Sequence, residues 1–222
     1  MSLYPIFLKL EGHKVLIVGG GSVAEQKLEA VLRSATDVTV IAPQVTDRIR
    51  SWADEGRVKH LAAEYRAGMA QGYFLVIAGT DSEDVNRAVY KEARQCGALA
   101  NAVDDPDHCD FYAPAVVNRG DFQIAISTGG ASPALSQHVR QDLERTYGPE
   151  YGPWTAWLGR TRAALRQALP RSEARKQLIR MLALAIPKRI SDNHRTEGDD
   201  HGRCKTQPTG SQSERNPEGA SA

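Results

Sequence analysis

The sequence predicts an α/β fold organised around a mostly parallel sheet. Strand-like and helix-like patterns alternate through the first hundred residues, as consecutive βαβ units require. Residues 15–24, VLIVGGGSVA, pass from a continuous apolar run through three glycines into a helical pattern. This order is typical of a buried parallel strand followed by a tight turn and a helix. Together these observations predict a Rossmann-like domain with a binding crevice at the carboxyl ends of its strands.

The first part of the chain is expected to contain five strands and three helices. The strands are predicted near residues 15–18, 38–41, 57–61, 74–78 and 98–102, and the helices near 22–34, 44–55 and 82–95. The third helix has the clearest limits, because Ser82 can cap its start and Gly97 suits its end.

The pattern changes after an acidic loop at 104–110. The elements expected there are strands at 115–117 and 122–127 with a hairpin turn at 118–121, and helices at about 132–147, 153–168 and 172–186. From residue 190 the sequence is polar and charged with almost nothing to bury, which predicts a disordered tail.

The bulk composition favours an intracellular globular protein. The chain has 222 residues of which 41% are hydrophobic, enough for a packed core. Cys96, Cys109 and Cys204 have no paired or metal-like spacing, so we expect no disulfide. The start of the chain does not read as a signal peptide and no apolar run reaches the length of a membrane span. We therefore expect a cytoplasmic protein without membrane contact.

Charge is unevenly distributed along the chain. The net charge is +1, yet residues 151–190 carry nine Lys and Arg against one acidic residue. Such a region could attract nucleic acid or an acidic small molecule, or pair with the acidic part of a partner subunit. Because interleaved aromatic residues and a nucleic-acid-binding motif are missing, we expect no nucleic acid partner.

The first glycine-rich turn predicts a dinucleotide site. Gly19 permits the tight turn, Gly21 lets the backbone approach a pyrophosphate, and Ala24 lets the helix pack close to its strand. The backbone N–H groups of Ser22 and Val23 would then face the phosphates. A glycine-rich turn without a ligand is the alternative, and the flanking strand and helix patterns disfavour it.

The residues alone leave the choice between NAD and NADP open. An NAD site usually has a carboxylate at the end of the second strand, but here that strand ends in Pro43 and Gln44. Gln44 or the backbone could hold the ribose. Arg48 and Arg50 could accept a 2′-phosphate, although solvated helix charges are the favoured interpretation.

Two carboxylates follow the fifth predicted strand. Asp104 and Asp105 come where a doubly wound sheet presents its crevice. A carboxylate beside apolar surface suits a general base or a transient metal contact, whereas an ordinary Asp-rich turn is an equal alternative. His108 and Cys109 are adjacent and lack a second ligand pair, so we expect no permanent metal site.

A second glycine-rich turn at 127–133 precedes another helix, which Ser132 is placed to cap. Its N–H groups and the helix dipole could bind an anion, with hydroxyls from Ser127 and Thr128. A plain strand-to-helix connection is the alternative, slightly favoured when this turn is considered alone.

Taken together, these motifs resemble the dehydrogenase/ferrochelatase module of siroheme synthase, that is, the precorrin-2 dehydrogenase family. The matching segments are 5–7, 18–27, 40–43, 78–81, 101–105, 111–114 and 127–133. They occur in the family's order and cover about residues 1–185.

The resemblance implies an architecture and a reaction. It implies an NAD-binding Rossmann domain at 1–113, a dimerisation and substrate region at 114–148, a small α-helical domain at 149–187 and the disordered tail at 188–222. Two chains would intertwine as a homodimer. The implied reaction is NAD-dependent oxidation of precorrin-2, a tetrapyrrole, to sirohydrochlorin, in some relatives followed by Fe²⁺ insertion.

The resemblance also implies roles for single residues. Asp104 would be the catalytic acid/base and a transient Fe²⁺ contact. The expected cofactor-binding residues are Gly19, Gly21, Ser22, Val23, Ala24, Pro43, Gln44 and Thr80, and the expected substrate-binding residues are Ser127, Thr128, Gly129, Gly130, Arg119 and His138. An NAD(H)-sensing protein without catalysis and an unrelated NAD(P)-dependent reductase are the alternatives, and the reductase leaves the Asp104 and Ser127 segments unexplained.

Overall fold

The computed structural model describes residues 3–184. The predicted disordered tail at 188–222 lies outside these residues. The chain divides into two compact units: a sheet unit, made of residues up to Val116 together with Ala125–Gln141, and a helical unit, made of Val117–Ile124 and the residues from Asp142 onward. The boundaries of the four regions expected from the sequence remain predictions.

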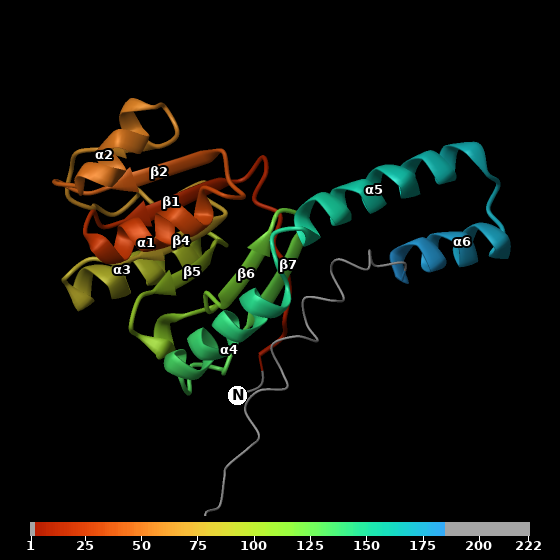
Figure 1. Cartoon of the computed structure of the whole chain (residues 1–222). Coiled ribbons are helices and arrows are strands. Elements are labelled where there is room, and N and C mark those ends of the chain that lie inside the picture. Colours follow the sequence, from red (N-terminus) through yellow and green to blue (C-terminus); the bar gives the residue numbers. More distant parts are fainter. Residues whose placement is uncertain (1–2, 185–222) are drawn as a thin grey trace, which may run out of the picture. The chain divides into compact units, whose positions relative to one another are not determined.

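The sheet unit is built on a five-stranded parallel sheet (Figure 1). Its strands are β1 (Lys14–Val18), β2 (Asp37–Ile41), β3 (Lys59–Leu61), β4 (Leu75–Ala78) and β5 (Leu99–Ala102). They lie in the order β3-β2-β1-β4-β5, with every pair parallel. This order confirms the predicted Rossmann-like sheet and places its switch point between β1 and β4, where such folds bind ligands.

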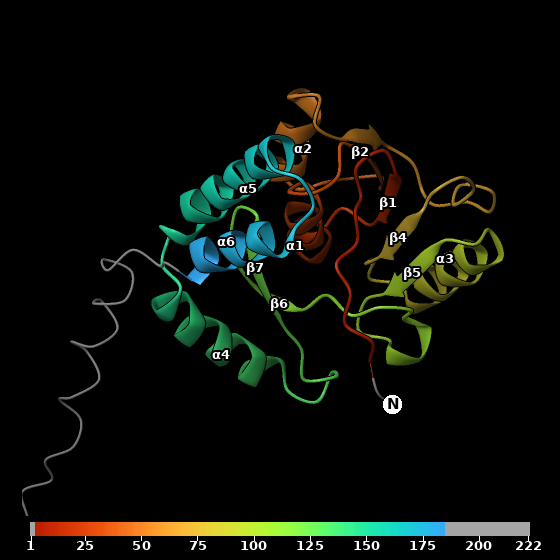
Figure 2. The ribbon, with the colours of Figure 1, turned by 90° about the vertical axis from the view of Figure 1, so that its right-hand side faces the viewer.

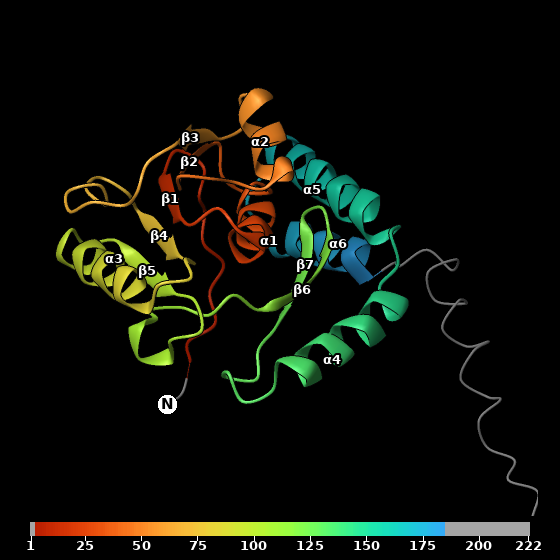
Figure 3. The same ribbon diagram turned by 90° about the vertical axis from the view of Figure 1, so that its left-hand side faces the viewer.

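Helices cover both faces of this sheet. Helices α1 (Ser22–Val31) and α2 (Asp47–Asp54) lie on one side, and α3 (Glu83–Gln95) lies on the other (Figures 2 and 3). The side chains of β1 alternate accordingly, because Val15 and Ile17 belong to the core cluster of α1 and α2 while Leu16 and Val18 belong to that of α3. Burial on both faces explains why β1 is an unbroken apolar run rather than an alternating one.

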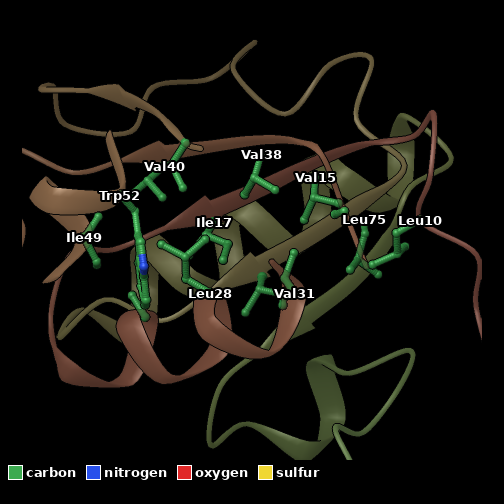
Figure 4. Packing of buried hydrophobic residues seen from close by; sticks show 14 residues of the cluster. Leu10, Val15, Ile17, Leu28, Val31, Val38, Val40, Ile49, Trp52 and Leu75 are labelled. Carbon is green, nitrogen blue, oxygen red and sulfur yellow. The ribbon is translucent and has the colours of Figure 1, made fainter. Parts of the chain in front are cut away.

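The larger core cluster fixes α1 and α2 against the sheet (Figure 4). Leu28 of α1 and Ile49 of α2 are fully buried, and Trp52 is 4% exposed. Truncating a fully buried leucine such as Leu28 to alanine costs about 2–5 kcal/mol of stability. The glycine-rich turn before α1 is therefore held by a well-packed helix.

Helix α2 begins three residues later than predicted. Thr46 is its N-cap, with Oγ1 accepting a hydrogen bond from the N–H of Ile49 at 3.3 Å. The N–H of Thr46 in turn donates to the carbonyl of Gly20 at 3.0 Å. Residues 43–46 are thus part of the turn against the glycine-rich loop. The predicted cap of α3 is confirmed, since Ser82 Oγ accepts from the N–H of Val85.

The rest of the described chain contains a short 3₁₀ turn, a hairpin and three helices. These are η1 (Pro106–His108), β6 (Ala115–Arg119), β7 (Phe122–Ile126), α4 (Pro133–Thr146), α5 (Tyr151–Ala168) and α6 (Glu173–Leu184). Strands β6 and β7 pair in a sheet of their own, and Gly120 in their turn has a φ of +70°. The expected hairpin and helices are confirmed to within a few residues, except that the predicted end of the last helix at 186 lies outside the described residues.

The helical unit contains few buried side chains. Helices α5 and α6 have no buried residue, and the stacked rings of Trp154 and Trp157 lie on α5 with centroids 4.8 Å apart. Across residues 3–184, no helix is long and apolar enough to cross a membrane. Cys96 and Cys109 are free thiols, and Cys204 lies outside the described range.

Candidate active site

A cavity of about 1110 Å³ lies at the carboxyl ends of β1, β2 and β4, within the sheet unit. We call it the glycine-loop cavity. Seven of the eight residues expected to bind a cofactor line it: Gly19, Gly21, Ser22, Val23, Pro43, Gln44 and Thr80. The eighth, Ala24, is 1% exposed and packs in the core, in keeping with its expected role in helix packing.

The three glycines of the loop have different structural roles. A Cβ on Gly19 would lie 2.3 Å from the carbonyl oxygen of Gly79, and one on Gly20 would lie 2.0 Å from that of Gln44. The φ of Gly19, +121°, also requires glycine. A Cβ on Gly21 would meet no atom within 4 Å. Gly19 and Gly20 therefore let the loop pack on its neighbours, whereas Gly21 leaves the cavity side open.

The N-terminus of α1 faces this cavity without a side-chain cap. Gly21 is the N-cap residue and supplies no side chain, so no side-chain hydrogen bond closes the first turn. The first N–H groups of a helix have no partner within it. Together with the helix dipole, uncapped N–H groups of this kind suit a phosphate group.

Among residues 3–184, the charged side chains that line the glycine-loop cavity are all acidic. They are Glu64, Asp81 and Asp104. Neither Arg48 nor Arg50 lines it, and the Arg48 guanidinium instead lies 5.1 Å from the ring centroid of Trp52. An NAD site usually has a carboxylate at the end of the second strand. Glu64 follows β3 instead, so this rule does not identify it from the sequence.

The Thr80 turn is fixed by a buried asparagine that sequence reasoning missed. Asn86 on α3 is 6% exposed. Its Oδ1 accepts from the N–H of Thr80 at 3.0 Å and from Thr80 Oγ1 at 2.8 Å, and its Nδ2 donates to the carbonyl of Thr80 at 3.0 Å. This reciprocal bonding sets the wall of the cavity after β4.

Asp104 lies just beyond β5 in a strained backbone conformation. Its φ is +63°, and within the described part of the chain it is the one non-glycine residue with a positive φ. The flanking N–H groups of Val103 and Asp105 donate to the carbonyls of Ala78 and Ala102 at 2.8 and 3.2 Å, which holds this conformation. Strain of this kind is concentrated at functional sites.

The neighbouring Asp105 is committed to other partners. Its Oδ2 lies 3.1 Å from Nε of Arg87 and 2.9 Å from Nδ1 of His108. The His108 ring, and with it the Arg87 guanidinium, lowers the pKa of the Asp105 carboxyl. Among residues 3–184, no hydrogen bond or ion pair engages the Asp104 carboxylate, which leaves it available for chemistry.

His108 and Cys109 are directed to different groups. Cys109 Sγ donates to the carbonyls of Ala102 and Asp105 at 3.1 and 3.2 Å, and burial raises the pKa of this thiol, which stays protonated. His108 faces Asp105. The described residues contain no group of three or more potential metal ligands.

A second cavity, of about 430 Å³, lies in the same unit. We call it the second-turn cavity. Of the residues expected to bind substrate, Ser127, Thr128 and Gly130 line it, but Gly129 and His138 do not. Val103 and Asp104 line both cavities. The two cavities therefore meet at Asp104.

Arg119 has a different environment from the one expected. It belongs to the helical unit, and its guanidinium donates to the carbonyls of Asn118, Glu144 and Tyr147 at 3.0–3.2 Å. The last two carbonyls lie at the end of α4, so the side chain closes that helix. A role in binding substrate remains a prediction.

The second turn satisfies many of its own polar groups. Ser132 Oγ accepts from the N–H of Leu135 at 3.2 Å, and Pro133 has no N–H. Thr128 Oγ1 donates to the carbonyl of Ser132 and accepts from its N–H, both at 3.1 Å. Ser136 Oγ lies 3.3 Å from Thr128 Oγ1. The predicted cap by Ser132 is confirmed, and it leaves the start of α4 less open to an anion than the start of α1.

Sequence reasoning missed several residues of the second-turn cavity. They include Gln26, Lys27, Asn101 and Tyr112. On α1, Val23 lines the first cavity, and Lys27 and Ala30 line the second. These positions recur at helical spacing and therefore share one face of the helix that the sequence predicts. Since Val23 was expected at the cofactor site, this spacing could have identified Lys27 and Ala30 as neighbours of that site.

Two protein families match successive parts of the chain. Residues 6–115 match the family described as putative NAD(P)-binding, and residues 119–146 match the family described as sirohaem biosynthesis protein central. Together these matches span more than half of the chain.

The relatives include siroheme synthases of bacteria. That of Actinobacillus pleuropneumoniae is 34% identical over 198 residues, which cover 89% of this chain and 41% of the relative. That of Methylococcus capsulatus is 40% identical over 176 residues, which cover 79% of this chain and 37% of the relative. The chain thus spans about two fifths of the length of these relatives.

A solved structure resembles the chain over most of its length. It is that of SirC, a precorrin-2 dehydrogenase, which is 28% identical with a TM-score of 0.68, covering 85% of this chain and 92% of that one. The resemblance inferred from the sequence is therefore confirmed: the chain belongs to the family of siroheme synthases and precorrin-2 dehydrogenases.

Proposed function

We propose that this chain catalyses the NAD-dependent dehydrogenation of precorrin-2 to sirohydrochlorin. The observation that carries the proposal is the position of Asp104, which lines both the glycine-loop cavity and the second-turn cavity. A dinucleotide in the first cavity and a tetrapyrrole in the second would meet beside this carboxylate. The matched NAD(P)-binding family and the similarity to a precorrin-2 dehydrogenase support it.

The residues that line the glycine-loop cavity are suited to binding NAD. The uncapped start of α1 and the open side of Gly21 suit its pyrophosphate. When bound, NAD supplies a nicotinamide ring that accepts a hydride. Because Glu64, Asp81 and Asp104 line the cavity and no basic side chain does in the described chain, an additional 2′-phosphate would meet uncompensated negative charge. This favours NAD over NADP.

Asp104 acts as the general base in this proposal. The reaction removes two hydrogens from the substrate: one leaves as a hydride to the coenzyme and the other leaves as a proton. Asp104 takes the proton, since its carboxylate has no competing partner among the described residues and Asp105 is held by Arg87 and His108. A positioned general base contributes about 10²–10⁴-fold to a rate.

Iron insertion is the second candidate activity. Its support is the same uncommitted Asp104 carboxylate, which could take pyrrole N–H protons and contact Fe²⁺ weakly as the ion enters the ring. The separate assay is sirohydrochlorin with Fe²⁺ under anaerobic conditions. Acceleration over the uncatalysed rate supports it, and no acceleration would mean dehydrogenation alone.

We also propose a homodimer. Helices α5 and α6 bury no residue, and apolar side chains of the N-terminal segment, Tyr4, Ile6 and Phe7, are 60–87% exposed. Apolar surface of this kind marks interaction sites. Sedimentation should give a dimer at working concentration, and a monomer would contradict the proposal. The cytoplasmic location expected from the sequence stays a prediction.

The decisive experiment for the activity is a balanced turnover assay. The full chain is incubated with precorrin-2 and NAD, and NADH and sirohydrochlorin are both quantified. We expect them to form in equal amounts, with a far lower rate for NADP. Binding of NAD without turnover would favour an NAD(H)-sensing protein, and turnover of an unrelated carbonyl substrate would favour another reductase.

A further inference from the structure

We propose that Lys27 binds a carboxylate of the substrate in the second-turn cavity, beside Asp104. This inference rests on the proposed function and identifies how that function's substrate is held.

Lys27 is the basic side chain of this cavity. It lies on α1 one helical turn after Val23, which lines the glycine-loop cavity. Among the described residues that line the second-turn cavity, no other Lys, Arg or His occurs. Cys109 lines the same cavity, and the Lys27 charge acts to lower the pKa of its thiol against the larger effect of burial.

Within the described part of the chain, the Lys27 ammonium has no protein partner. In the described range 3–184, neither an ion pair nor a hydrogen bond engages it, although the residue is partly buried. Arg87, which contacts the same loop, is already paired with Asp105 and Glu83. A partly buried ammonium group without a counter-ion loses hydration without compensation, and an anionic ligand would supply that compensation.

The other groups of the cavity are less suited to an acidic ligand. Asp104 would repel a carboxylate at close range. The hydroxyls of Thr128 and Ser136 bond to the turn itself, and Ser132 caps α4. A tetrapyrrole carrying several carboxylates therefore needs a cation here, and Lys27 supplies it. Asp104 and Lys27 are not within ion-pair distance, so each is free to contact a different part of the ligand.

The test replaces Lys27 by methionine, which keeps most of the unbranched stem and a good helix propensity. Lys27→Arg is the conservative variant, and Lys91→Met, on α3 outside both cavities, is the matched control. For each protein we measure kcat and KM for precorrin-2 at saturating NAD, the Kd of sirohydrochlorin and the Kd of NAD.

We expect Lys27→Met to raise KM for precorrin-2 and Kd for sirohydrochlorin by about 10- to 100-fold, the loss of one charge-assisted hydrogen bond. The Kd of NAD should not change. Lys27→Arg should recover most of the affinity, and Lys91→Met should match the wild type. Binding of sirohydrochlorin should weaken with salt more steeply in the wild type than in Lys27→Met, and methyl-esterified sirohydrochlorin should bind both alike.

The results that would contradict the role of Lys27 differ from those that would contradict the proposed function. If the wild type turns over precorrin-2 and Lys27→Met has the same KM and Kd, the inference is wrong while the proposed function stands. A lowered kcat with unchanged Kd and a shifted pH profile would assign Lys27 to Asp104 instead of the ligand. If the wild type neither binds sirohydrochlorin nor reduces NAD with precorrin-2, the proposed function fails and this inference with it.

Discussion

The two glycine-rich turns of the sheet unit have similar compositions but opposite hydrogen-bonding states. Each joins a strand to a helix, β1 to α1 and β7 to α4. The first turn has no side-chain cap and borders the larger cavity. The second is closed by Ser132 and Thr128. We infer from this contrast that glycine alone does not make an anion site: the helix N–H groups must also be left without internal acceptors.

Substitution of Asp104 should have the largest effect on turnover, because this residue lies where the cavities of the two turns meet. We expect Asp104→Ala to lower turnover of precorrin-2 by about 10²-fold or more, the loss of a general base. The Kd values of NAD and sirohydrochlorin should change little, since neither turn is altered. Steady-state kinetics with separate binding titrations checks this. Undiminished turnover would remove Asp104 from the mechanism.

Two glycine substitutions should separate loop packing from NAD binding in the first turn. Gly20→Ala places a methyl 2.0 Å from the Gln44 carbonyl, and overpacking against backbone should cost about 1–3 kcal/mol of unfolding free energy. Gly21→Ala meets nothing within 4 Å and needs no unusual φ, so it should lower stability by less than about 1 kcal/mol, the N-cap preference for glycine over alanine, and weaken NAD binding. Denaturant unfolding and NAD titration separate the two. Equal NAD affinity in Gly21→Ala and the wild type would argue against a pyrophosphate at this residue.

The contribution of the second turn to stability should depend on its N-cap residue, Ser132. Removing the Ser132 hydroxyl should destabilise the chain by about 1 kcal/mol, as for other N-cap serines. Ser22→Ala is the matched control at the start of α1, where no side-chain cap exists, and we expect a change within about 0.5 kcal/mol. If both serines cost the same in denaturant unfolding, the contrast between the turns is wrong.

The smallest effect concerns the loop that follows Asp104. The pKa of Asp105 is lowered in the folded state, mainly by His108, so its charge stabilises the fold above its unfolded pKa. That stabilisation disappears as the pH falls through the lower, folded-state value. Asp105→Asn should therefore be less stable than the wild type at neutral pH, and the two should converge in acid.

Unfolding measured across the acid range checks this pH dependence. Asp107→Asn, an exposed neighbour in the same loop, is the control, and it should track the wild type throughout. A difference between Asp105→Asn and the wild type that grows as the pH falls would have the wrong sign and would contradict the role of the ion pairs.

Much of the fold follows from local sequence signals. The unbroken apolar run of β1 predicts a strand buried on both faces, and Ser82 and Ser132 were identified as caps because their side chains act within one turn of backbone. The start of α2 was missed by three residues, since it depends on Thr46 and its contact with Gly20. That contact joins segments that are distant in sequence.

The candidate site was only partly predictable for the same reason. The first glycine turn and Asp104 are recognisable because each motif is local. Glu64, Asn86 and Lys27 were missed because their roles depend on which strands and helices adjoin the crevice, and Arg119 was expected in it although its guanidinium closes α4. A long cationic side chain is equally compatible with a ligand and with backbone carbonyls, so its sequence position does not distinguish them.

The most direct test is the crystal structure of the full chain with NAD and sirohydrochlorin bound together. We predict the pyrophosphate at the start of α1, the nicotinamide beside Asp104, and the macrocycle in the second-turn cavity with a carboxylate at Lys27. A nicotinamide or a macrocycle bound away from Asp104 would contradict the central claim that one aspartate serves two adjoining cavities.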